Sequence, residues 1–449
     1  MASPARLRSQ YDEIFIESND QKRTIDIRKG VVSIDYYEDV FSPTITATIT
    51  VVNTGDSIAK ADDEGNPDGA RQSIYNGLPL RGGERVSIKI AGNTSSNPGL
   101  DFSKKSADYL YVSSISNVIS ESKRESFTLN LVSRESITNE TTRVAKKYPT
   151  SSRIDQSVQD ILKNYLKTDK TILLDETSNQ YGFIGNLRKP FTVLVWLASK
   201  AVPKISGDAT AGFLFFQTKD GYHFRSIDKL ITEKPKATYT YVGTSQEGTN
   251  KDFNILSYTT NRNQNLLEKL RLGAYASYRV FYNPLTGEFT PQEKSVFKSS
   301  DYIGKSKNLG KTLSLPKISS DSEQTLGDIP SRIITQILDI GTMEKDASIS
   351  ATNSDPTKYQ SQTLMRYNVL MTQTLSMTVA SNTNLRAGDI IECQFPKVSK
   401  SDGNQFDDEQ SGLYMIKELC HRFDTDGSYT SMLLVRDTFG RYGTNNKED

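Results

Sequence analysis

The sequence contains two copies of one pattern. Leu80–Glu84 reads Leu-Arg-Gly-Gly-Glu, and Leu385–Asp389, at an offset of 305 residues, reads Leu-Arg-Ala-Gly-Asp. Two further segments recur at offsets of 303 and 302 residues, namely Leu110–Val112 with Leu413–Met415 and Ser126–Arg134 with Ser428–Arg436. These segments alternate in the manner of half-buried strands, so the repeated unit is predicted to be a β domain.

An upstream pair of strands extends the repeat. Thr44–Ile49 corresponds to Thr374–Val379 if copy one carries an insertion before Leu80. Ile49 and Leu80 are 31 residues apart, whereas Val379 and Leu385 are 6 apart, which makes the insertion 25 residues long. Its sequence, Thr54–Gly77, is rich in turn-forming residues and predicts a long exposed loop or β-arm. Two copies of one unit can present two near-equivalent surfaces, which favours assembly over catalysis.

The length of 449 residues exceeds what one hydrophobic core usually serves. We expect a mainly β protein with an α+β domain: two homologous β-barrel or sandwich domains, a smaller α+β domain and a loop-rich insertion. The predicted boundaries are 10–133 for copy one with its arm at 54–77, 134–249 for the α+β domain, 250–298 and 366–440 for a discontinuous copy two, and 299–365 for the insertion.

Local patterns predict the individual elements. Strands are expected at Val31–Tyr37, Thr44–Val52, Arg85–Ile90, Tyr109–Ser116, Ser126–Val132 and Ile255–Thr260. Helices are expected at 153–166, where apolar residues recur every three or four positions, and at 192–200 and 362–370. Lys219-Asp220-Gly221 predicts a hairpin between Phe213–Gln217 and Tyr222–Arg225, because Asp-Gly tolerates positive φ.

Charge and hydropathy exclude some classes of function. Charged residues make up 24% of the chain and the formal net charge is +1, so the sequence lacks the basic character of most nucleic-acid-binding proteins. No apolar run reaches the roughly 18 residues that a membrane-spanning helix needs, and Met1–Gln10 lacks the apolar segment of a signal peptide. We therefore expect a soluble protein without a membrane-spanning segment, made in the cytoplasm.

The residues that could carry chemistry favour structural roles. His223 and His421 lie in strand patterns and are interpreted as structural histidines. Cys393 and Cys420 lie on neighbouring predicted strands, where they could approach one another, but they lack the ligand spacing of a zinc site and are interpreted as small strand residues. Trp196 lies on an apolar helix face and is assigned to the core.

Other chemical motifs are missing from the sequence. The acidic loop Asp62–Asp68 lacks the downstream glutamate of a calcium loop and is interpreted as solvated. No nucleophile elbow, phosphate-binding loop or zincin motif occurs. The prediction is a protein that is not an enzyme and has no catalytic residues, metal or cofactor, although paired carboxylates of a glycoside hydrolase stay open because their separation is invisible in sequence.

The doubled unit and two further segments, Phe213–Leu230 and Val32–Pro43, resemble the central baseplate hub protein of contractile-tailed (myovirus-type) bacteriophages. The resemblance covers most of the chain as a pattern, and none of its motifs is diagnostic alone. It implies two tube-like β domains per subunit and a homotrimer, so that three chains supply six similar positions. We expect Thr44–Val52 and Thr374–Ala380, with the strands that follow Gly83 and Gly388, to build the ring wall.

The resemblance also implies a role and partners. Such a ring adapts a hexameric tail tube to a trimeric central spike protein, lines the channel through which DNA passes, and resides in the baseplate of the virion tail. Tail tube or tube-initiator proteins, the tape-measure protein and surrounding baseplate proteins are the implied neighbours. Two alternatives stay open: the hub or adapter of a related contractile injection or type VI-like system, and a tail-tip cell-wall hydrolase or glycan-binding protein.

Overall fold

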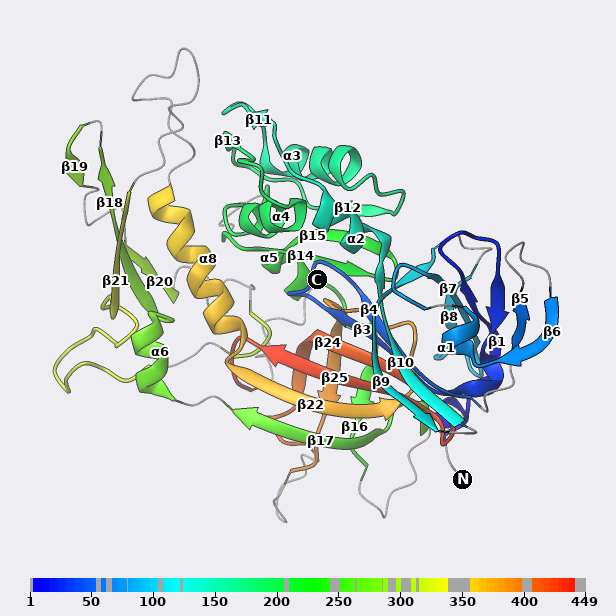
Figure 1. The fold of residues 1–449 in the computed structure, drawn as a ribbon. Coiled ribbons are helices and arrows are strands. Elements are labelled where there is room, and N and C mark those ends of the chain that lie inside the picture. Colours follow the sequence, from blue (N-terminus) through cyan, green and yellow to red (C-terminus); the bar gives the residue numbers. More distant parts are fainter. Residues whose placement is uncertain are drawn as a thin grey trace.

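The computed structural model of the chain describes residues 3–53, 58–61, 67–78, 80–103, 108–121, 124–205, 210–242, 251–262, 265–284, 286–289, 296–299, 308–311, 315–337, 356–397 and 406–440. The fold is mainly β, as predicted, and its largest element is a single sheet of 14 strands (Figure 1).

Copy one forms one half of this sheet. Its strands follow the spatial order β3 (Val31–Asp39), β4 (Thr46–Asn53), β10 (Arg124–Ser133), β9 (Leu110–Glu121) and β7 (Arg85–Ala91), each antiparallel to its neighbour. β1 (Tyr11–Glu17), β2 (Thr24–Asp26) and β8 (Gly99–Phe102) extend the sheet beyond β7. Alternate side chains of the sheet, such as Ile34, Ile49 and Leu129, are buried in one core with those of β1, β7 and β8.

Copy two repeats this arrangement. Its strands follow the order β17 (Ile255–Arg262), β22 (Gln373–Ala380), β25 (Ser428–Arg436), β24 (Gly412–Asp424) and β23 (Ile390–Gln394). β16 (Thr238–Thr240) adds to β23 in parallel. A second core, which includes Leu375, Met377 and Leu434, lies under this half of the sheet. The six predicted strands of the two copies are all present, and β9 continues five residues beyond the predicted end at Ser116.

The α+β elements form a separate core. They comprise α2 (Arg134–Thr141), β11 (Lys147–Tyr148), α3 (Ile154–Asp160), a π-helical turn (Ile161–Tyr165), β12 (Ile172–Leu174), β13 (Phe183–Ile184), α4 (Pro190–Ala198), β14 (Phe213–Thr218), β15 (Gly221–Ser226) and α5 (Ile227–Ile231). β14 and β15 form the predicted hairpin, and Gly221 has φ of 133°. The apolar faces of α3 and α4 are buried against this hairpin.

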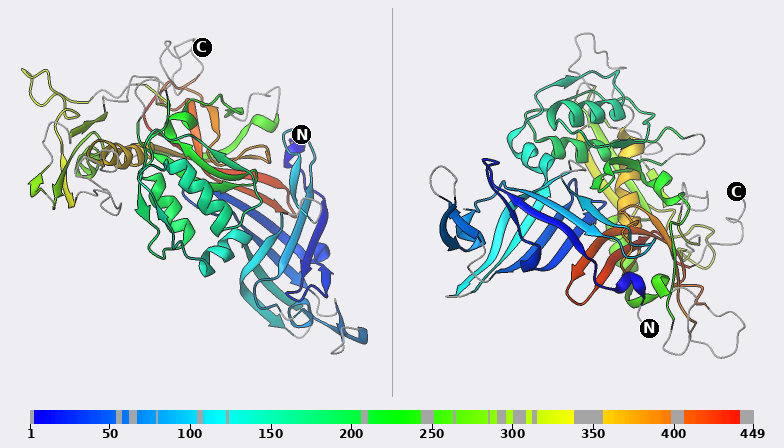
Figure 2. Two further views of the ribbon diagram at one scale, coloured as in Figure 1. Left: turned by 90° about the horizontal axis from the view of Figure 1, so that it is seen from above. Right: turned by 90° about the vertical axis from the view of Figure 1, so that its right-hand side faces the viewer.

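These elements cover one end of the long sheet (Figures 1 and 2). Side chains of β14 and α5, including Phe216 and Leu230, share a core with Val40, Met415 and Val435. Val40 follows the end of β3, Met415 lies near the start of β24 and Val435 near the end of β25, so all three lie at the same end of their antiparallel strands. The two rims of the sheet therefore differ: one is covered by the α+β elements and the other ends in strand turns.

A small sheet lies at the side of the molecule. β18 (Ala276–Asn283) pairs with β19 (Glu288–Phe289), β20 (Val296–Lys298) and β21 (Arg332–Ile337), and α8 (Pro356–Leu370) packs against it through Met365 and Val369. α6 (Leu266–Leu272) precedes β18. From the range 250–298, assigned to copy two in the sequence, only β17 joins the copy-two sheet. α8 begins six residues before the helix predicted at 362–370.

The copy-one insertion contains a two-stranded β-arm. β5 (Ile58–Ala61) pairs with β6 (Pro67–Gln72), and α1 (Ile74–Gly77) follows. The acidic loop named in the sequence, Asp62–Asp68, lies for the most part outside the described residues.

Candidate assembly site

The Leu-Arg-x-Gly segments of the two copies form the same turn. Gly83 and Gly388 have φ of 92° and 93°, and their N–H groups donate to the carbonyls of Val112 and Ile416 at 2.7 and 2.8 Å. The acidic residue that follows each glycine accepts the N–H of the arginine two residues upstream of that glycine, at 2.7 Å in copy one and 2.9 Å in copy two. The positive φ explains why each copy has glycine at this position.

The two copies also share two β-bulges at equivalent positions. β9 bulges against β10 at Ser113, and β24 bulges against β25 at Lys417. β3 bulges against β4 at Val32, and β17 bulges against β22 at Leu256. Because a bulge inserts one residue and flips the faces beyond it, two bulges at matching places show that the two sheets have the same topology and register.

The pairing corrects the alignment taken from the sequence. Buried Phe127, Leu129 and Leu131 correspond to buried Thr430, Met432 and Leu434, an offset of 303 residues rather than the 302 expected from Ser126 and Ser428. By the same pairing, the residues of β9 near its start correspond to β24 residues 304 further on, not 303. The residues of β4 correspond to β22 residues 328 further on, as Thr48 does to Ser376, not to the residues 330 further on that the alignment of Thr44 with Thr374 gave. A shift of one residue exchanges the two faces of a strand, so sequence similarity alone chose the wrong face.

The two copies are joined edge to edge. β24 pairs antiparallel with β3 over seven residue pairs, from Glu418 opposite Asp39 to Asp424 opposite Ser33. Phe423 contributes from β24 to the core of copy one. His421 stacks on Tyr36 across the junction, with ring centroids 6.1 Å apart and planes inclined by 3°. The backbone ladder and the shared core make one continuous sheet from two homologous units (Figure 1).

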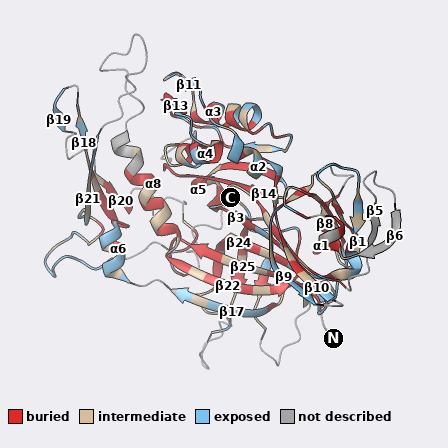
Figure 3. Ribbon diagram, in the orientation of Figure 1, coloured by how far each residue is buried: buried red, intermediate tan, exposed pale blue. Residues whose placement is uncertain are grey.

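The outer edges of this double unit are β17 and the second half of β9. β17 is the terminal strand of the copy-two half and pairs with β22 alone among the described strands. β7 reaches only Tyr111 of β9, so on the side of β9 that faces away from β10 no described strand pairs with Ser113 to Glu121. Both segments are exposed (Figure 3), and Ile119 is 58% exposed. Such edges are templates for pairing with another chain.

The face of the sheet opposite the cores is open and rich in hydroxyl groups. A hollow of about 720 Å³ lies over β17, β22, β25, β24, β3 and β4. Its lining includes the hydroxyl side chains Thr46, Ser257, Thr259, Ser376, Thr378 and Ser431. Charge on this face gathers at the internal junction, where Arg422 pairs with Asp35 at 3.6 Å and with Asp424 at 2.9 Å.

Glu38 ties the copies to the α+β elements. This carboxylate is 2% exposed and accepts hydrogen bonds from the Tyr36 hydroxyl at 2.8 Å, the Lys219 N–H at 2.8 Å and the Ala387 N–H at 2.9 Å. Burial raises the pKa of Glu38, and these donors, with Arg386 nearby, oppose that effect. Glu38, in the segment Val32–Pro43, is therefore a buried acceptor at the point where copy one, copy two and the α+β hairpin come into contact.

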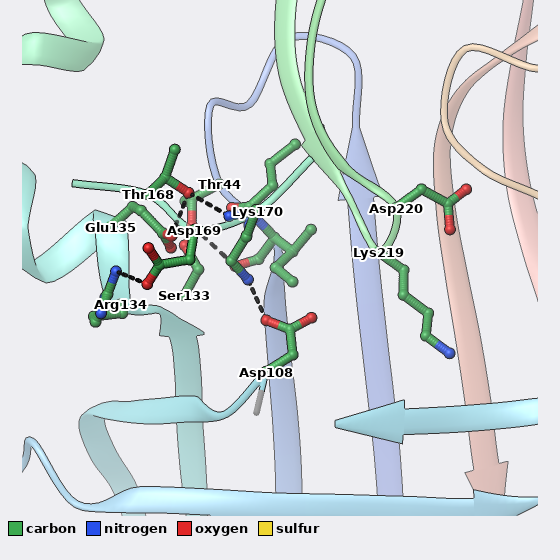
Figure 4. Close-up of polar contacts among 12 residues, drawn as sticks. Thr44, Asp108, Ser133, Arg134, Glu135, Thr168, Asp169, Lys170, Lys219 and Asp220 are labelled. Carbon is green, nitrogen blue, oxygen red and sulfur yellow. Dashed lines mark hydrogen bonds and ion pairs between the residues drawn. The ribbon is translucent and has the colours of Figure 1, made fainter. Parts of the chain in front are cut away.

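A cleft of about 450 Å³ separates copy one from the α+β elements (Figure 4). Lys170 pairs with Asp108 across it, and Arg134 pairs with Asp169 at 3.5 Å. Glu135 accepts the Thr168 hydroxyl at 2.7 Å. Of these contacts, only the Lys170–Asp108 ion pair joins copy one to the α+β elements, whereas the contacts of Arg134 with Asp169 and of Thr168 with Glu135 lie within the α+β elements.

The two histidines are buried. His223 is 8% exposed, with Nε2 2.8 Å from the Thr218 hydroxyl, and His421 is fully buried, with Nδ1 3.0 Å from the Thr430 hydroxyl. Burial lowers the pKa of His223 to about 4 and that of His421 to about 3. Both rings lie within packed elements, so their surroundings agree with a structural role.

The cysteines are not close to one another. Cys393 lies opposite Gly412, eight residues along β24 from Cys420, which is roughly 26 Å at strand spacing. Both thiols are free, and burial raises the pKa of Cys420 to about 12. Across the described ranges, no group of three or more His, Cys, Asp or Glu side chains is arranged to hold a metal ion. Trp196 packs edge-on against Tyr181 and Phe183 at the border of the α+β core.

A known structure shares this architecture. The chain is similar to a 43 kDa tail protein of prophage MuSo2 from Shewanella oneidensis, at 9% identity over 95% of this chain and 98% of that chain, with a TM-score of 0.51. The chain has the fold of a prophage tail protein. It is also similar to a tail protein from Neisseria meningitidis, at 10% identity over 94% and 96% of the two chains, with a TM-score of 0.49.

The chain is also similar to a component of the type VI secretion system from Escherichia coli, at 9% identity over 92% and 76% of the two chains, with a TM-score of 0.43. No protein-family model matches the sequence, and no curated protein is similar to it by sequence. None of the described helices is long and apolar enough to span a bilayer.

Sequence reasoning missed the two edges. The predicted strand Tyr109–Ser116 ends before the β9 segment Asn117–Glu121, although this segment, Asn-Val-Ile-Ser-Glu, contains the strand-favouring residues Val118 and Ile119. The signal was available in the repeat, because Lys417–Asp424 of copy two has a longer strand pattern at the corresponding place.

Proposed function

We propose that this chain is the structural hub of a contractile phage tail, a homotrimeric ring with pseudo-sixfold symmetry. One observation carries the proposal: two β units of the same topology stand edge to edge in one continuous sheet. Because the two units join through unlike edges, those of β24 and β3, the equivalent edges of β9 and β17 stay free at the two ends of the sheet. Repetition of the same contact between chains would close a ring. The tail-protein fold supports this role.

The strand count supports an open channel. Each chain contributes eight strands to the path from β17 to β9, so three chains would supply 24. Closed barrels of 16–18 strands already leave an aqueous lumen, so a ring of this size has room for a channel. The open, hydroxyl-rich face would line that channel, since the opposite face of the sheet is buried in the two cores.

The chemistry of the lining suits passage of a polyanion. Proteins that hold DNA neutralise phosphates with arginine and lysine, whereas the described residues of this face carry mainly hydroxyl groups. At the internal junction, the four acids Asp35, Asp39, Glu418 and Asp424 outnumber the two cations that pair with them, Arg422 and Lys417. Such a surface gives DNA little to bind, which favours movement over retention.

The two different rims suit an adapter. The rim covered by the α+β elements and the rim of strand turns present different surfaces, so a hexameric tube and a trimeric spike protein could each dock on one rim. The role is structural rather than catalytic and belongs to the baseplate of a virion tail. A hub of a related contractile injection system would use the same ring.

The oligomeric mass tests this proposal. The 50.1 kDa chain should elute as a species of three times that mass in light scattering and keep that mass on dilution to micromolar concentration. The trimer should also bind the spike protein of the same tail. A folded chain that stays monomeric at high concentration, alone and with the spike protein, would contradict the proposal.

A further inference from the structure

We infer that β9 of one subunit pairs antiparallel with β17 of the next, in a register that places Ile119 opposite Thr259. The occupant of each open edge is thus a second copy of this chain. The inference rests on the ring proposed above and adds the pair of strands and the register that hold the ring together.

The register follows from the internal junction. At that junction Arg422 of β24 lies opposite Asp35 of β3. Arg422 pairs on its other side with Tyr429, and Ile119 pairs with Ser126, the residue that corresponds to Tyr429 in copy one. Ile119 is therefore the counterpart of Arg422.

The counterpart of Asp35 is found in the same way. Asp35 pairs with Thr48 of β4, and Thr259 pairs with Ser376 of β22. Thr48 and Ser376 are equivalent because β4 and β22 pair in the same register with β10 and β25. Thr259 thus corresponds to Asp35, and repetition of the internal contact brings Ile119 to Thr259.

β9 adapts to this contact through one extra residue. Three steps separate Ser116 from Ile119, where two separate Cys420 from Arg422, and the ladder with β10 shifts at this point. Asn117 absorbs the extra residue with φ of 52°, a conformation that asparagine tolerates. Beyond the bulge the register is again that of copy two, so Ser120 would lie opposite Tyr258 and Glu121 opposite Ser257.

The composition of both edges fits burial. Natural sheets protect exposed edges with lysine, proline or inward-pointing charge. The segment Ser113–Glu121 has one charged residue, at its end, and β17 has one, Arg262, also at its end. Val118 and Ile119 are 44% and 58% exposed, and Leu256 is 37% exposed. Two long, nearly uncharged edges of complementary kind on one chain favour pairing between copies.

Disulfide trapping tests the register. In a Cys420→Ser background, the variant Ile119→Cys/Thr259→Cys should form covalent trimers under mild oxidation, seen on non-reducing gels. The matched control Ile119→Cys/Ser257→Cys moves one cysteine two residues along the strand, beyond the roughly 7 Å Cα separation that a disulfide spans. Arg422→Cys/Asp35→Cys is the positive control, because it should close the equivalent bond within one chain.

The outcomes separate the inference from the proposed function. Trimers trapped through Ile119 and Thr259 but not through Ile119 and Ser257 would support the register. A trimer by light scattering that traps neither pair, or traps the control as well, would overturn the register and leave the ring intact. A monomer by light scattering would remove the ring itself.

Two further experiments guard against misfolding. If the double variant fails to fold, a mixture of Ile119→Cys chains and Thr259→Cys chains should give a covalent dimer of unlike chains. Ile119→Lys should weaken trimer formation at least tenfold with an unchanged circular dichroism spectrum, whereas Leu187→Lys, at an exposed leucine of the α+β elements, should leave it unchanged. Equal effects of the two lysine substitutions would contradict the inference.

Discussion

The carboxylate of Glu38 accepts the backbone N–H of Lys219 at 2.8 Å, and so joins the first copy to the turn of the α+β hairpin. Its second oxygen accepts the N–H of Ala387 in copy two. One buried side chain thus fixes three parts of the chain relative to one another, as the proposed ring with two dissimilar rims would require.

Replacing Glu38 by glutamine should destabilise the protein. The amide can accept at only one oxygen, so one buried N–H loses its acceptor at a cost of about 1–3 kcal/mol. Denaturant unfolding followed by fluorescence would measure the change. Glu418→Gln is the control, since Glu418 is 45% exposed and pairs with Lys417 at the surface, where the expected change is below about 1 kcal/mol. Equal losses in the two variants would contradict this role of Glu38.

Alanine substitutions at the two glycine turns should lower the stability of the protein to a similar extent. Gly83→Ala and Gly388→Ala both place a side chain at φ near 90°, and each should lower stability by about 1–3 kcal/mol. The added methyl group would lie 3.1 Å from Asn19 Oδ1 in copy one and 3.0 Å from the Phe216 ring in copy two. Gly287→Ala, at φ of 72° with open space around it, should cost less. Thermal unfolding of the three variants is the measurement, and a neutral effect at either turn would argue against the shared geometry.

Stability should fall as the pH drops below about 6.5. Burial holds the pKa of His421 at about 3 and that of His223 at about 4, against about 6.5 for a solvent-exposed histidine. The unfolded chain therefore takes up protons that the folded chain cannot, and near pH 5 each histidine costs about 2 kcal/mol of stability. Asp389 opposes this trend, because burial raises its pKa to about 6 and its contribution is lost as the pH rises.

Glutamine substitutions separate the contribution of the histidines to the pH dependence of stability from that of Asp389. Denaturation midpoints of the parent chain and of the variants His421→Gln and His223→Gln should be compared near pH 7 and pH 5. Each variant should lose less stability than the parent between the two pH values. An unchanged pH dependence would show that neither histidine is held neutral in the fold.

The buried cluster around Arg366 should be costly to break. Arg366 is 1% exposed and pairs with Asp228 at 3.0 Å and Asp437 at 3.1 Å, linking α8 to α5 and to the end of copy two. Arg366→Met leaves two carboxylates buried without their cation, at an expected cost of about 3–5 kcal/mol. Lys229→Met, which removes a half-exposed partner of Asp175, should cost below about 1 kcal/mol in the same unfolding assay. A similar cost for both would mean that the buried cluster adds nothing.

The sequence predicted those parts of the fold that local pattern controls. The repeat and the alternation of Thr44–Val52 and Ser126–Val132 identified the strands, and Asp220-Gly221 identified the hairpin, because strand period and turn chemistry act within a few residues. The expected register differs from the observed one by one residue for β10 and β25, where the similar side chains Phe127 and Tyr429 occupy opposite faces of their strands, and by two residues for β4 and β22.

The candidate site depends on relations that no local pattern contains. The pairing of β24 with β3 brings together residues more than 370 positions apart, and only then do β9 and β17 become recognisable as the remaining edges. β18 resembled its neighbour β17 as a strand, yet it joins a different sheet through β21. Strand propensity indicates which residues form strands, but long-range packing determines which strands pair with one another.

The most direct test of the account is a cryo-electron microscopy reconstruction of the purified assembly. The account predicts a closed ring of three chains and six similar β units, with β9 of each chain against β17 of the next and the hydroxyl-rich face toward the channel. A particle in which the two copies do not share one annulus, or in which β9 and β17 stay uncovered, would contradict it.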